Sequence, residues 1–349
     1  MKKQNKNISP DLSILDALKY MDTVESKLLI VMENNKFIGL ISIGDIQRAI
    51  IKNVNLDNPI KNILRGKYNV ASPEMTIETI KALMFENRME LCPIVNSKNE
   101  LIDVIFWDDV FKDNKIIKPE QFNLPVVIMA GGFGTRLKPL TNVLPKPLIP
   151  IGSKTMLEEI FDRFTIHGCN HFFVSINYKA ELIEYYLESL NLPYNVNCFR
   201  EEIPSGTAGS LSLLKEKINS TFFVSNCDIL IEEDYSEILN YHKANNNEIT
   251  IVAALKHFPI SYGTLETTDN GKLLSIIEKP ELTYKINSGM YILEPHLLNE
   301  IPQDEFFHIT HLIEKILQRK GKIGVFPVSE KSWKDMGTMT EYLKFFTND

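Results

Sequence analysis

The stretch VVIMAGGFGTRLKPLTNVLPKPLIPIG, residues 126–152, decides the fold of the larger part of this 349-residue chain. It begins with a continuous apolar run, Val126 to Ala130, which is typical of a strand buried on both faces of a sheet. Gly131, Gly132 and Gly134 follow, and residues without side chains let backbone N–H groups approach phosphate oxygens closely. The stretch therefore predicts a phosphate-binding loop at the end of a buried strand.

The loop differs from two common phosphate loops. Leu137 occupies the place of the last glycine in a dinucleotide-binding GxGxxG, and no Gly-Lys-Ser/Thr follows as in a Walker loop. Arg136 and Lys146 supply the local positive charge that a triphosphate needs in a chain whose net charge is −7. That acidic balance disfavours nucleic acid as a partner, because phosphate backbones reward clustered Lys and Arg.

Downstream of the loop, short apolar runs alternate with helical patterns, which predicts an α/β domain with a mixed, mostly parallel sheet. The runs cover residues 172–176, 222–225 and 249–254, and the helical segments include 180–190 and 309–320. A polar segment, residues 112–121, precedes the first strand and marks a domain boundary.

The whole stretch resembles the signature of the sugar-1-phosphate nucleotidyltransferases, GG-x-GTRL-x-P-x-T followed by PKPL. The resemblance continues in the family's order through residues 200–211, 223–228, 261–267, 276–280, 286–293 and 333–343. It implies a Rossmann-like catalytic domain over residues 123–349. It also implies attack of a sugar-1-phosphate oxygen on the α-phosphorus of a nucleoside triphosphate, with release of pyrophosphate.

The resemblance assigns roles to individual residues of this chain. The triphosphate would be held by Gly131, Gly132, Gly134, Thr135 and Arg136, and the base and ribose by Glu202, Gly206 and Thr207. The sugar phosphate would contact Lys146, Tyr262, Gly263, Glu278, Lys279, Asn287 and Gly289. Asp228 and Asp335 match the family's magnesium ligands, and with Arg136 and Lys146 they form the implied catalytic group. Hard carboxylate oxygens suit Mg²⁺ bridging phosphate oxygens.

Several residues of these motifs allow a second interpretation. Cys227, beside Asp228, has no histidine near it in sequence, which favours a buried small residue over a nucleophile. His308 and His311 have the spacing of two helical metal ligands, but their place at a helix start favours surface or capping roles. Met339 stands where the family commonly has proline, which leaves the phosphate and metal ligands intact.

The first third of the chain repeats itself at an offset of about 64 residues, so that Asp45 matches Asp109. Each copy predicts helix, strand, turn, strand and helix. The repeat resembles a tandem CBS (α+β) module over residues 1–118, with halves near 1–57 and 58–118. Ser42, Asp45 and Asp109 match positions that hold a regulatory nucleotide in such modules, and a scaffold that binds nothing is the alternative.

The arrangement of the two modules narrows the expected function. It resembles glucosamine-1-phosphate guanylyltransferases of nonulosonic (legionaminic-type) acid pathways, which implies GTP, glucosamine-1-phosphate, GDP-glucosamine and surface glycan synthesis. A mannose-1-phosphate guanylyltransferase, or an enzyme that uses UTP or dTTP, is the alternative. Other classes are a CBS-based nucleotide-sensing protein and a glycosyltransferase, but the GTRL–PKPL loop suits a triphosphate. CBS pairs commonly associate, which predicts a homo-oligomer.

Four cysteines without a CxxC pair argue against a zinc ribbon or a disulfide framework. The positive N-terminus lacks the apolar segment of a signal peptide, and no apolar run approaches the length of a membrane span. We therefore expect a cytoplasmic protein without a membrane partner.

Overall fold

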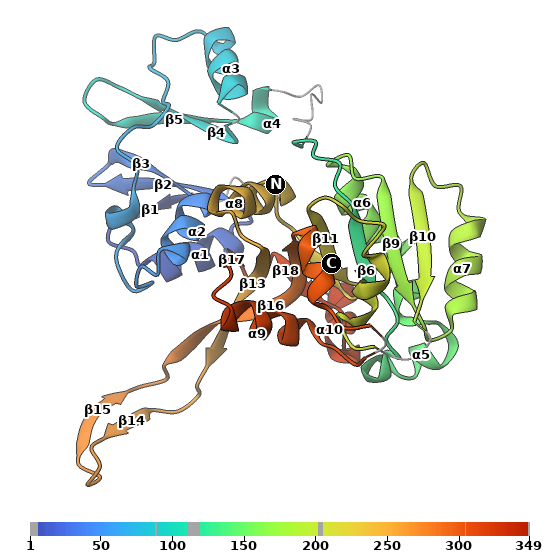
Figure 1. Cartoon of the computed structure of the whole chain (residues 1–349). Helices are drawn as coiled ribbons and strands as arrows, with labels where there is room; N and C mark the ends of the chain where they lie inside the picture. The colour runs from blue at the N-terminus through green and yellow to red at the C-terminus, as the bar shows by residue number, and fades with distance from the viewer. Residues whose placement is uncertain (1–5, 88, 111–118, 202–204, 304, 348–349) are drawn as a thin grey trace. The chain divides into compact units, whose positions relative to one another are not determined.

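The computed structural model describes residues 6–87, 89–110, 119–201, 205–303 and 305–347 of the chain. Contacts divide the chain into two compact units, Met1–Lys118 and Pro119–Asp349. Figure 1 shows the elements of both units, which are described separately. Among the described residues, no helix is long and apolar enough to cross a bilayer.

The unit Met1–Lys118 contains two copies of one arrangement. The first copy consists of α1 (Ile14–Thr23), β2 (Leu28–Glu33), β3 (Lys36–Ser42) and α2 (Ile43–Ile51). The second consists of α3 (Ile77–Glu86), β4 (Leu91–Val95), β5 (Leu101–Phe106) and α4 (Trp107–Val110). The remaining elements are β1 (Asn7–Ile8), which pairs with β2, and η1 (Ile60–Ile63). Each copy thus has the predicted order of elements.

Local sequence signals explain how the first copy begins and turns. The Ser13 side chain accepts a hydrogen bond from the Asp16 backbone at 3.0 Å and caps α1. Asn34 and Asn35 link β2 to β3 with φ values of 50° and 61°. Asparagine tolerates this left-handed conformation, which matches the twist of a two-residue hairpin. The hairpin therefore supplies the turn that the sequence predicts between the two strands of the first copy.

The unit Pro119–Asp349 is built on a seven-stranded sheet in the order β10-β9-β6-β11-β16-β13-β17. The strands are β6 (Val126–Met129), β9 (His171–Ile176), β10 (Asn195–Arg200), β11 (Phe222–Asn226), β13 (Ile249–Pro259), β16 (Glu281–Leu293) and β17 (Ile323–Val328). Among the strands that the structure describes in this sheet, β16 alone runs antiparallel to its neighbours. The predicted mixed, mostly parallel sheet is confirmed.

Both faces of the sheet are covered, which is why its first strand is apolar throughout. Val126 and Ile128 belong to one hydrophobic cluster and Val127 to the other, as the alternation of a strand requires. The first cluster includes residues of α6 (Met156–Thr165), α7 (Ala180–Ser189), α8 (Tyr235–Asn245) and α10 (Met339–Thr347). The second includes residues of α9 (Ile309–Gln318), η4 (Gly209–Leu214) and η5 (Pro295–Glu300).

The strand order reverses beside β6. The chain passes from β6 to β9 and β10 on one side of the sheet, and it returns to β11 on the other side. Ligands of such sheets bind beyond the carboxyl ends of the strands at this crevice. Asn226, the last residue of β11, is in register with Met129, the last residue of β6. The segments that follow these two strands therefore leave the sheet side by side.

Short elements follow β6 and β11 along the chain, and one strand near the C-terminus pairs with one of them. They are η2 (Thr135–Leu137), α5 (Leu140–Val143), η3 (Lys146–Leu148), β7 (Pro150–Ile151), β8 (Lys154–Thr155), β12 (Ile229–Ile231) and β18 (Trp333–Asp335). The strands β12 and β18 pair with each other, and Ile229 is in register with Asp335. This pairing brings the segment after β11 to the C-terminal part of the chain.

A two-stranded ribbon, residues 256–284, extends from β13 and β16 and is called the arm below. Its tip carries β14 (Thr264–Thr267) and β15 (Leu273–Ile277), and Figure 1 shows it projecting from the body of its unit. Nine large apolar side chains of the arm are 42–79% exposed. They belong to Phe258, Tyr262, Leu265, Leu273, Leu274, Ile276, Ile277, Leu282 and Tyr284.

Candidate functional site

The glycine loop after β6 is held in one conformation by its neighbours. Gly134 has φ of +62°, and a Cβ atom there would lie 2.7 Å from Thr141 Cγ2 and 3.2 Å from Lys146 Cβ. The Thr141 hydroxyl donates a hydrogen bond to the Gly134 carbonyl at 2.9 Å. Gly132, by contrast, has open space where a side chain would be. Thr135 and Arg136 are exposed, so the loop offers free groups to a ligand.

The two predicted metal carboxylates both lie close to Gly337. A Cβ atom on Gly337 would lie 2.5 Å from Asp228 Oδ2, 2.9 Å from Asp335 Oδ1 and 3.2 Å from Arg136 Nη2. The Gly337 N–H donates a hydrogen bond to Asp335 Oδ1 at 2.7 Å. The N–H of the preceding residue, Met336, donates to the backbone carbonyl of Asp228 at 2.8 Å. Asp228, Asp335 and Arg136, which are far apart in sequence, therefore meet at one point.

Lys146 completes this group. Its Nζ forms an ion pair with Asp228 Oδ2, and the two side chains are only 12% and 10% exposed. Carboxylates that sit among cations at a crevice can share a divalent cation with a bound polyanion. The structure thus unites all four predicted catalytic residues.

The predicted base and ribose segment lies partly outside the described residues, because Glu202 is not among them. Gly206 has φ of +81°, and the turn that it forms with Thr207 packs against the start of α9. The residue that reaches the glycine loop is Glu201, whose Oε1 would lie 3.0 Å from a Cβ on Gly131. The resemblance assigns Glu202 to the site and misses Glu201. The only available signal was that two glutamates stand side by side at this point of the motif.

Glu201 ties three segments together. Its carboxylate accepts hydrogen bonds from the Ser205 N–H at 3.1 Å and from the Ser175 hydroxyl on β9. Its backbone carbonyl accepts from Asn177 Nδ2 at 2.7 Å. A side chain on Gly131 would displace this carboxylate, which explains why a glycine stands there.

The structure divides the predicted sugar-binding residues into two groups. Asn287 and Gly289 lie on β16 next to the end of β11, and a Cβ on Gly289 would lie 2.5 Å from Asn226 Nδ2. Asn287 Oδ1 accepts a hydrogen bond from the Gly289 N–H at 3.1 Å. Both residues therefore border the crevice.

The second group lies on the arm. Tyr262 is 79% exposed, and Glu278 Oε2 would lie 2.8 Å from a Cβ on Gly263, so these residues are near one another. Lys279 is exposed as well. Eight residues of extended strand, at about 3.3 Å each, separate Glu281 from Gly289, which is about 26 Å. The structure does not bring this group to the crevice.

The structure agrees with the second interpretation of Cys227, and of His308 and His311 at the start of α9. Burial raises the pKa of the Cys227 thiol to about 12, with smaller opposing effects of Lys146 and Asp228. A thiol with such a pKa is protonated near neutrality and is a poor nucleophile. His308 is the N-cap of α9 and forms a capping box with His311, so the predicted capping role is confirmed.

In the unit Met1–Lys118, both oxygens of the Asp45 carboxylate accept hydrogen bonds from neighbouring side chains. Its Oδ1 accepts from Arg48 at 2.5 Å and from Arg65 at 2.6 Å, and its Oδ2 accepts from the Ser42 hydroxyl at 2.6 Å. Burial alone would raise the pKa of Asp45, but the hydrogen bonds of Ser42, Arg65 and Arg48 hold it below its usual value. Asp109 lies in α4, and its side chain is outside the described atoms.

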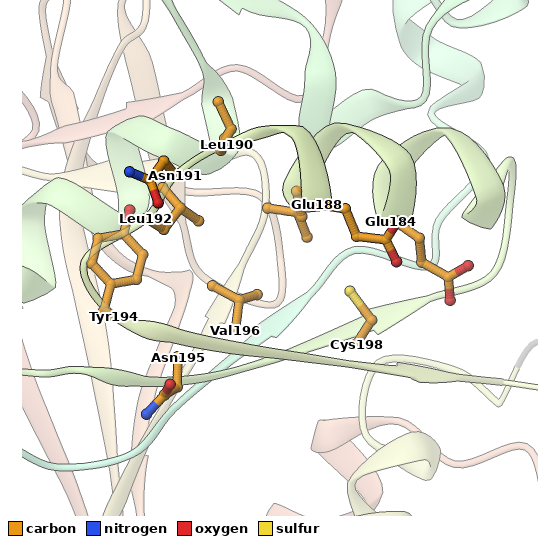
Figure 2. A pocket seen from close by; sticks show the side chains of 10 residues that line it. Glu184, Glu188, Leu190, Asn191, Leu192, Tyr194, Asn195, Val196 and Cys198 are labelled. Carbon is orange, nitrogen blue, oxygen red and sulfur yellow. The ribbon is translucent and has the colours of Figure 1, made fainter.

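A pocket of about 430 Å³ lies elsewhere, between α7 and the edge strand β10. Figure 2 shows its lining, which includes Glu184, Glu188, Tyr194 and Cys198. Glu184 is paired with Arg200, at 3.0 Å between Oε1 and Nε. Burial and then the two glutamates raise the pKa of Cys198 to about 11. The pocket therefore offers no activated nucleophile, and none of the predicted site residues lines it.

One further cluster has the composition of a metal site. Glu248, His296 and Glu300 place one ligand atom each within 4.8 Å of the others. Arg319 already binds this cluster, because its Nη2 lies 2.5 Å from Glu248 Oε2 and 2.6 Å from Glu300 Oε1. The guanidinium bridges both carboxylates and offsets part of their charge, so the cluster is explained as an ion-pair network.

Comparison with known families and curated proteins agrees with this geometry. The family model described as "Nucleotidyl transferase" matches residues 125–349, and that of the CBS domain matches residues 1–52. The mannose-1-phosphate guanylyltransferase catalytic subunit beta of Dictyostelium discoideum is 35% identical over 185 residues, which cover 51% of this chain and 52% of that protein. The mannose-1-phosphate guanyltransferase of Schizosaccharomyces pombe is 33% identical over 229 residues, 63% of this chain and 62% of that protein.

The matched region thus spans between half and two thirds of the length of these curated relatives. Among solved structures, HddC from Yersinia pseudotuberculosis is 28% identical with a TM-score of 0.51, over 64% of this chain and 99% of that one. HddC has also been solved with GMP-PN, and that structure is 27% identical with a TM-score of 0.50, over 64% of this chain and 99% of that one.

Proposed function

Because the chain belongs to the nucleotidyl transferase family, we propose that it transfers a guanylyl group from GTP to a sugar-1-phosphate and releases pyrophosphate. The observation that carries the proposal is the convergence of Arg136, Asp228 and Asp335 around Gly337, with Lys146 on Asp228. Guanylyl transfer is favoured over uridylyl or thymidylyl transfer by the names of the curated relatives.

The reaction needs alignment and charge neutralisation more than acid–base chemistry. A phosphate monoester with a second pKa of about 6 is largely dianionic at neutral pH, so its oxygen is a ready nucleophile. Two polyanions must then meet, and their repulsion is the main cost. In this proposal the exposed Arg136 would neutralise the departing pyrophosphate, and Lys146 would turn from Asp228 to the α-phosphate or the sugar phosphate.

Asp228 and Asp335 would hold a Mg²⁺ ion in this proposal. One oxygen of each carboxylate would lie within 3 Å of a Cβ atom on Gly337, so the two oxygens are near each other. Mg²⁺ prefers hard oxygen donors such as carboxylates. When bound, the ion would neutralise phosphate oxygens as charge develops. The Gly337 N–H holds the Asp335 carboxylate, and the Met336 N–H holds the backbone of Asp228 beside it.

Mannose-1-phosphate is the sugar that the relatives' names favour, and glucosamine-1-phosphate is the second candidate. The predicted link to nonulosonic acid synthesis and the predicted cytoplasmic location stay predictions. Asn287 and Gly289 are the sugar-binding candidates at the crevice, so the choice between the two sugars is expected to depend on them.

Pyrophosphate release tests the proposal directly. GTP, UTP and dTTP would each be combined with mannose-1-phosphate and glucosamine-1-phosphate in Mg²⁺, and GTP with mannose-1-phosphate should give the highest kcat/KM. If UTP or dTTP gives the highest value, the guanylyl assignment is wrong. If no pair releases pyrophosphate, catalysis itself fails, and a nucleotide-sensing protein becomes the better hypothesis.

For the unit Met1–Lys118 we propose a scaffold role. The carboxylate that would bind the ribose of a regulatory nucleotide is engaged by Arg48, Arg65 and Ser42. Calorimetric titration with AMP, ATP and GTP should therefore show no saturable binding to this unit in an Arg136→Ala chain, whose catalytic site is impaired. Saturable binding that Asp45→Asn abolishes would establish the nucleotide sensor instead.

We also propose that two copies of the chain associate through the arm. A lone two-stranded ribbon is marginally stable in water, and its nine exposed side chains present on the order of 800 Å² of apolar surface, one partner's share of a standard interface. Light scattering should detect a dimer that the double variant Leu274→Ser, Ile276→Ser dissociates. A monomeric wild-type chain at all concentrations would contradict this.

A further inference from the structure

The turn predicted to bind base and ribose is built against a segment about one hundred residues away. The Phe307 N–H donates to the Ser205 carbonyl at 2.9 Å, and the Ala208 N–H donates to the Phe307 carbonyl at 3.0 Å. That carbonyl would lie 2.8 Å from a Cβ on Gly206. The backbone just before α9 therefore forms one wall of the Gly206–Thr207 turn and leaves no room for a side chain there.

His308 adds side-chain contacts to this wall. Its Nδ1 lies 3.3 Å from the Thr207 N–H and 3.3 Å from the Thr207 hydroxyl, and the same hydroxyl accepts from the Ile309 N–H at 3.1 Å. The Thr207 N–H can only donate, so Nδ1 accepts from it and carries no proton in this arrangement. The Thr207 hydroxyl can then donate its own hydrogen to the same nitrogen.

His311 contacts the same backbone without touching the turn. Its Nδ1 accepts from the His308 N–H at 3.1 Å, which is the second half of the capping box of α9. His308 and His311 thus share the capping of one helix, but His308 alone of the two has a hydrogen bond to Thr207 among the described contacts. This difference allows a structural role to be separated from a role in ligand binding.

We propose that His308 is a positioning residue that fixes the Thr207 turn and thereby sets the affinity for the nucleotide. The proposal rests on the proposed function and on the resemblance that assigns the base and ribose to Gly206 and Thr207. Among the described hydrogen bonds and ion pairs, His308 has none to Arg136, Lys146 or the two carboxylates at Gly337, so its loss should act on nucleotide binding and leave the chemical step unchanged. Removing the acceptor leaves the Thr207 N–H and hydroxyl without this partner, and the turn loses its fixed orientation.

Steady-state kinetics with His308→Ala, His308→Asn and the matched control His311→Ala test the proposal. His308→Ala should raise the KM for GTP about tenfold, with kcat and the KM for the sugar-1-phosphate within twofold of wild type. His308→Asn should restore most of the affinity, because an amide oxygen can accept from Thr207 and asparagine is a good N-cap. His311→Ala should lower the melting temperature through the cap while leaving the KM for GTP unchanged.

Equal effects of His308→Ala and His311→Ala on KM would overturn the proposal, because capping would then explain both. An unchanged KM in His308→Ala would overturn it as well. Hydrogen exchange of the amides at residues 205–209 gives a readout that needs no activity: His308→Ala should speed this exchange more than His311→Ala does. A wild-type chain without turnover would sink the proposed function alone, whereas equal exchange in the two variants would sink the positioning role.

Discussion

Replacing Gly337 with alanine probes the meeting point of the predicted catalytic residues without substituting any of those residues. Gly337 has an ordinary backbone conformation, so the substitution adds a methyl group without backbone strain. That methyl would lie 2.5 Å from Asp228 Oδ2 and 2.9 Å from Asp335 Oδ1, whereas ordinary contacts are 3.4–4 Å. The alanine therefore pushes on both carboxylates at once.

The size of the effect follows from these distances. Asp228 Oδ2 must retreat by roughly 1 Å to reach an ordinary contact, and Asp335 Oδ1 by about half as much. A displacement of 1 Å at a reacting centre can lower turnover about 100-fold. Overpacking of this kind costs about 1–3 kcal/mol of folding free energy, so the variant should still fold. We therefore expect kcat to fall about 100-fold in a protein with a native circular dichroism spectrum.

Pyrophosphate release with GTP and mannose-1-phosphate, measured across a Mg²⁺ titration, is the assay. Gly337→Ala should also need more Mg²⁺ for half-maximal rate, because the two carboxylates no longer hold their native separation. Gly66→Ala is the matched control, since a Cβ there meets nothing within 4 Å and should leave both quantities unchanged. Wild-type turnover and Mg²⁺ dependence in Gly337→Ala would refute the idea that Asp228 and Asp335 act together.

Three other outcomes are expected. Asp228→Asn should keep the fold and lose metal-dependent pyrophosphate release, whereas near-wild-type activity would mean that the metal site lies elsewhere. Hydrogen bonding to Arg319 lowers the pKa of Glu248 from 4.5 to about 2, so its contribution to stability is complete above pH 4.5 and is lost as pH falls toward 2. Urea midpoints measured from pH 5 to pH 3 should therefore fall more steeply in wild type than in Glu248→Gln, and parallel curves would contradict this. Asp45→Asn should destabilise the N-terminal unit by about 1.5–3 kcal/mol through its charged hydrogen bonds, and unaltered hydrogen exchange in α2 would argue against it.

The central sheet could be predicted because its signals are local. The run from Val126 to Ala130 is apolar at every position, and the structure shows why: Val126 and Ile128 face one hydrophobic cluster and Val127 the other. The helices beginning at Ala180 and Ile309 start where the sequence places them. A strand that is buried on both faces is apolar at every position, and this pattern can be recognised without knowing which distant residues cover it.

The contacts that make up the site are not local, and the sequence alone gave no sign of most of them. Asp228 meets Asp335 because β12 pairs with β18, two strands of three residues each, too short for a periodic signal. His308 contacts Thr207 across 101 positions, and its neighbours in sequence indicate only a helix start. Such pairings depend on how the sheet folds, so the motif order predicts the members of the site but not their contacts.

The predicted sugar-binding residues show that a match to a family motif does not by itself place a residue at the site. Asn287 and Gly289 reach the crevice because β16 pairs with β11, and this pairing fixes both strands in the middle of the sheet. Glu278 and Lys279 follow β15, which among the described strand pairings is paired with β14 alone, so no register ties these residues to the crevice. A motif thus marks a position along the chain, and the pairing of the strand that carries it decides whether the residue reaches the substrate. For this reason the geometry supports the proposed metal-binding role of Asp228 and Asp335, whereas the predicted sugar-phosphate role of Glu278 and Lys279 rests on resemblance alone. Comparing the KM toward the sugar phosphate in variants at Asn287 and Gly289 with that in variants at Glu278 and Lys279 tests which group reaches the substrate.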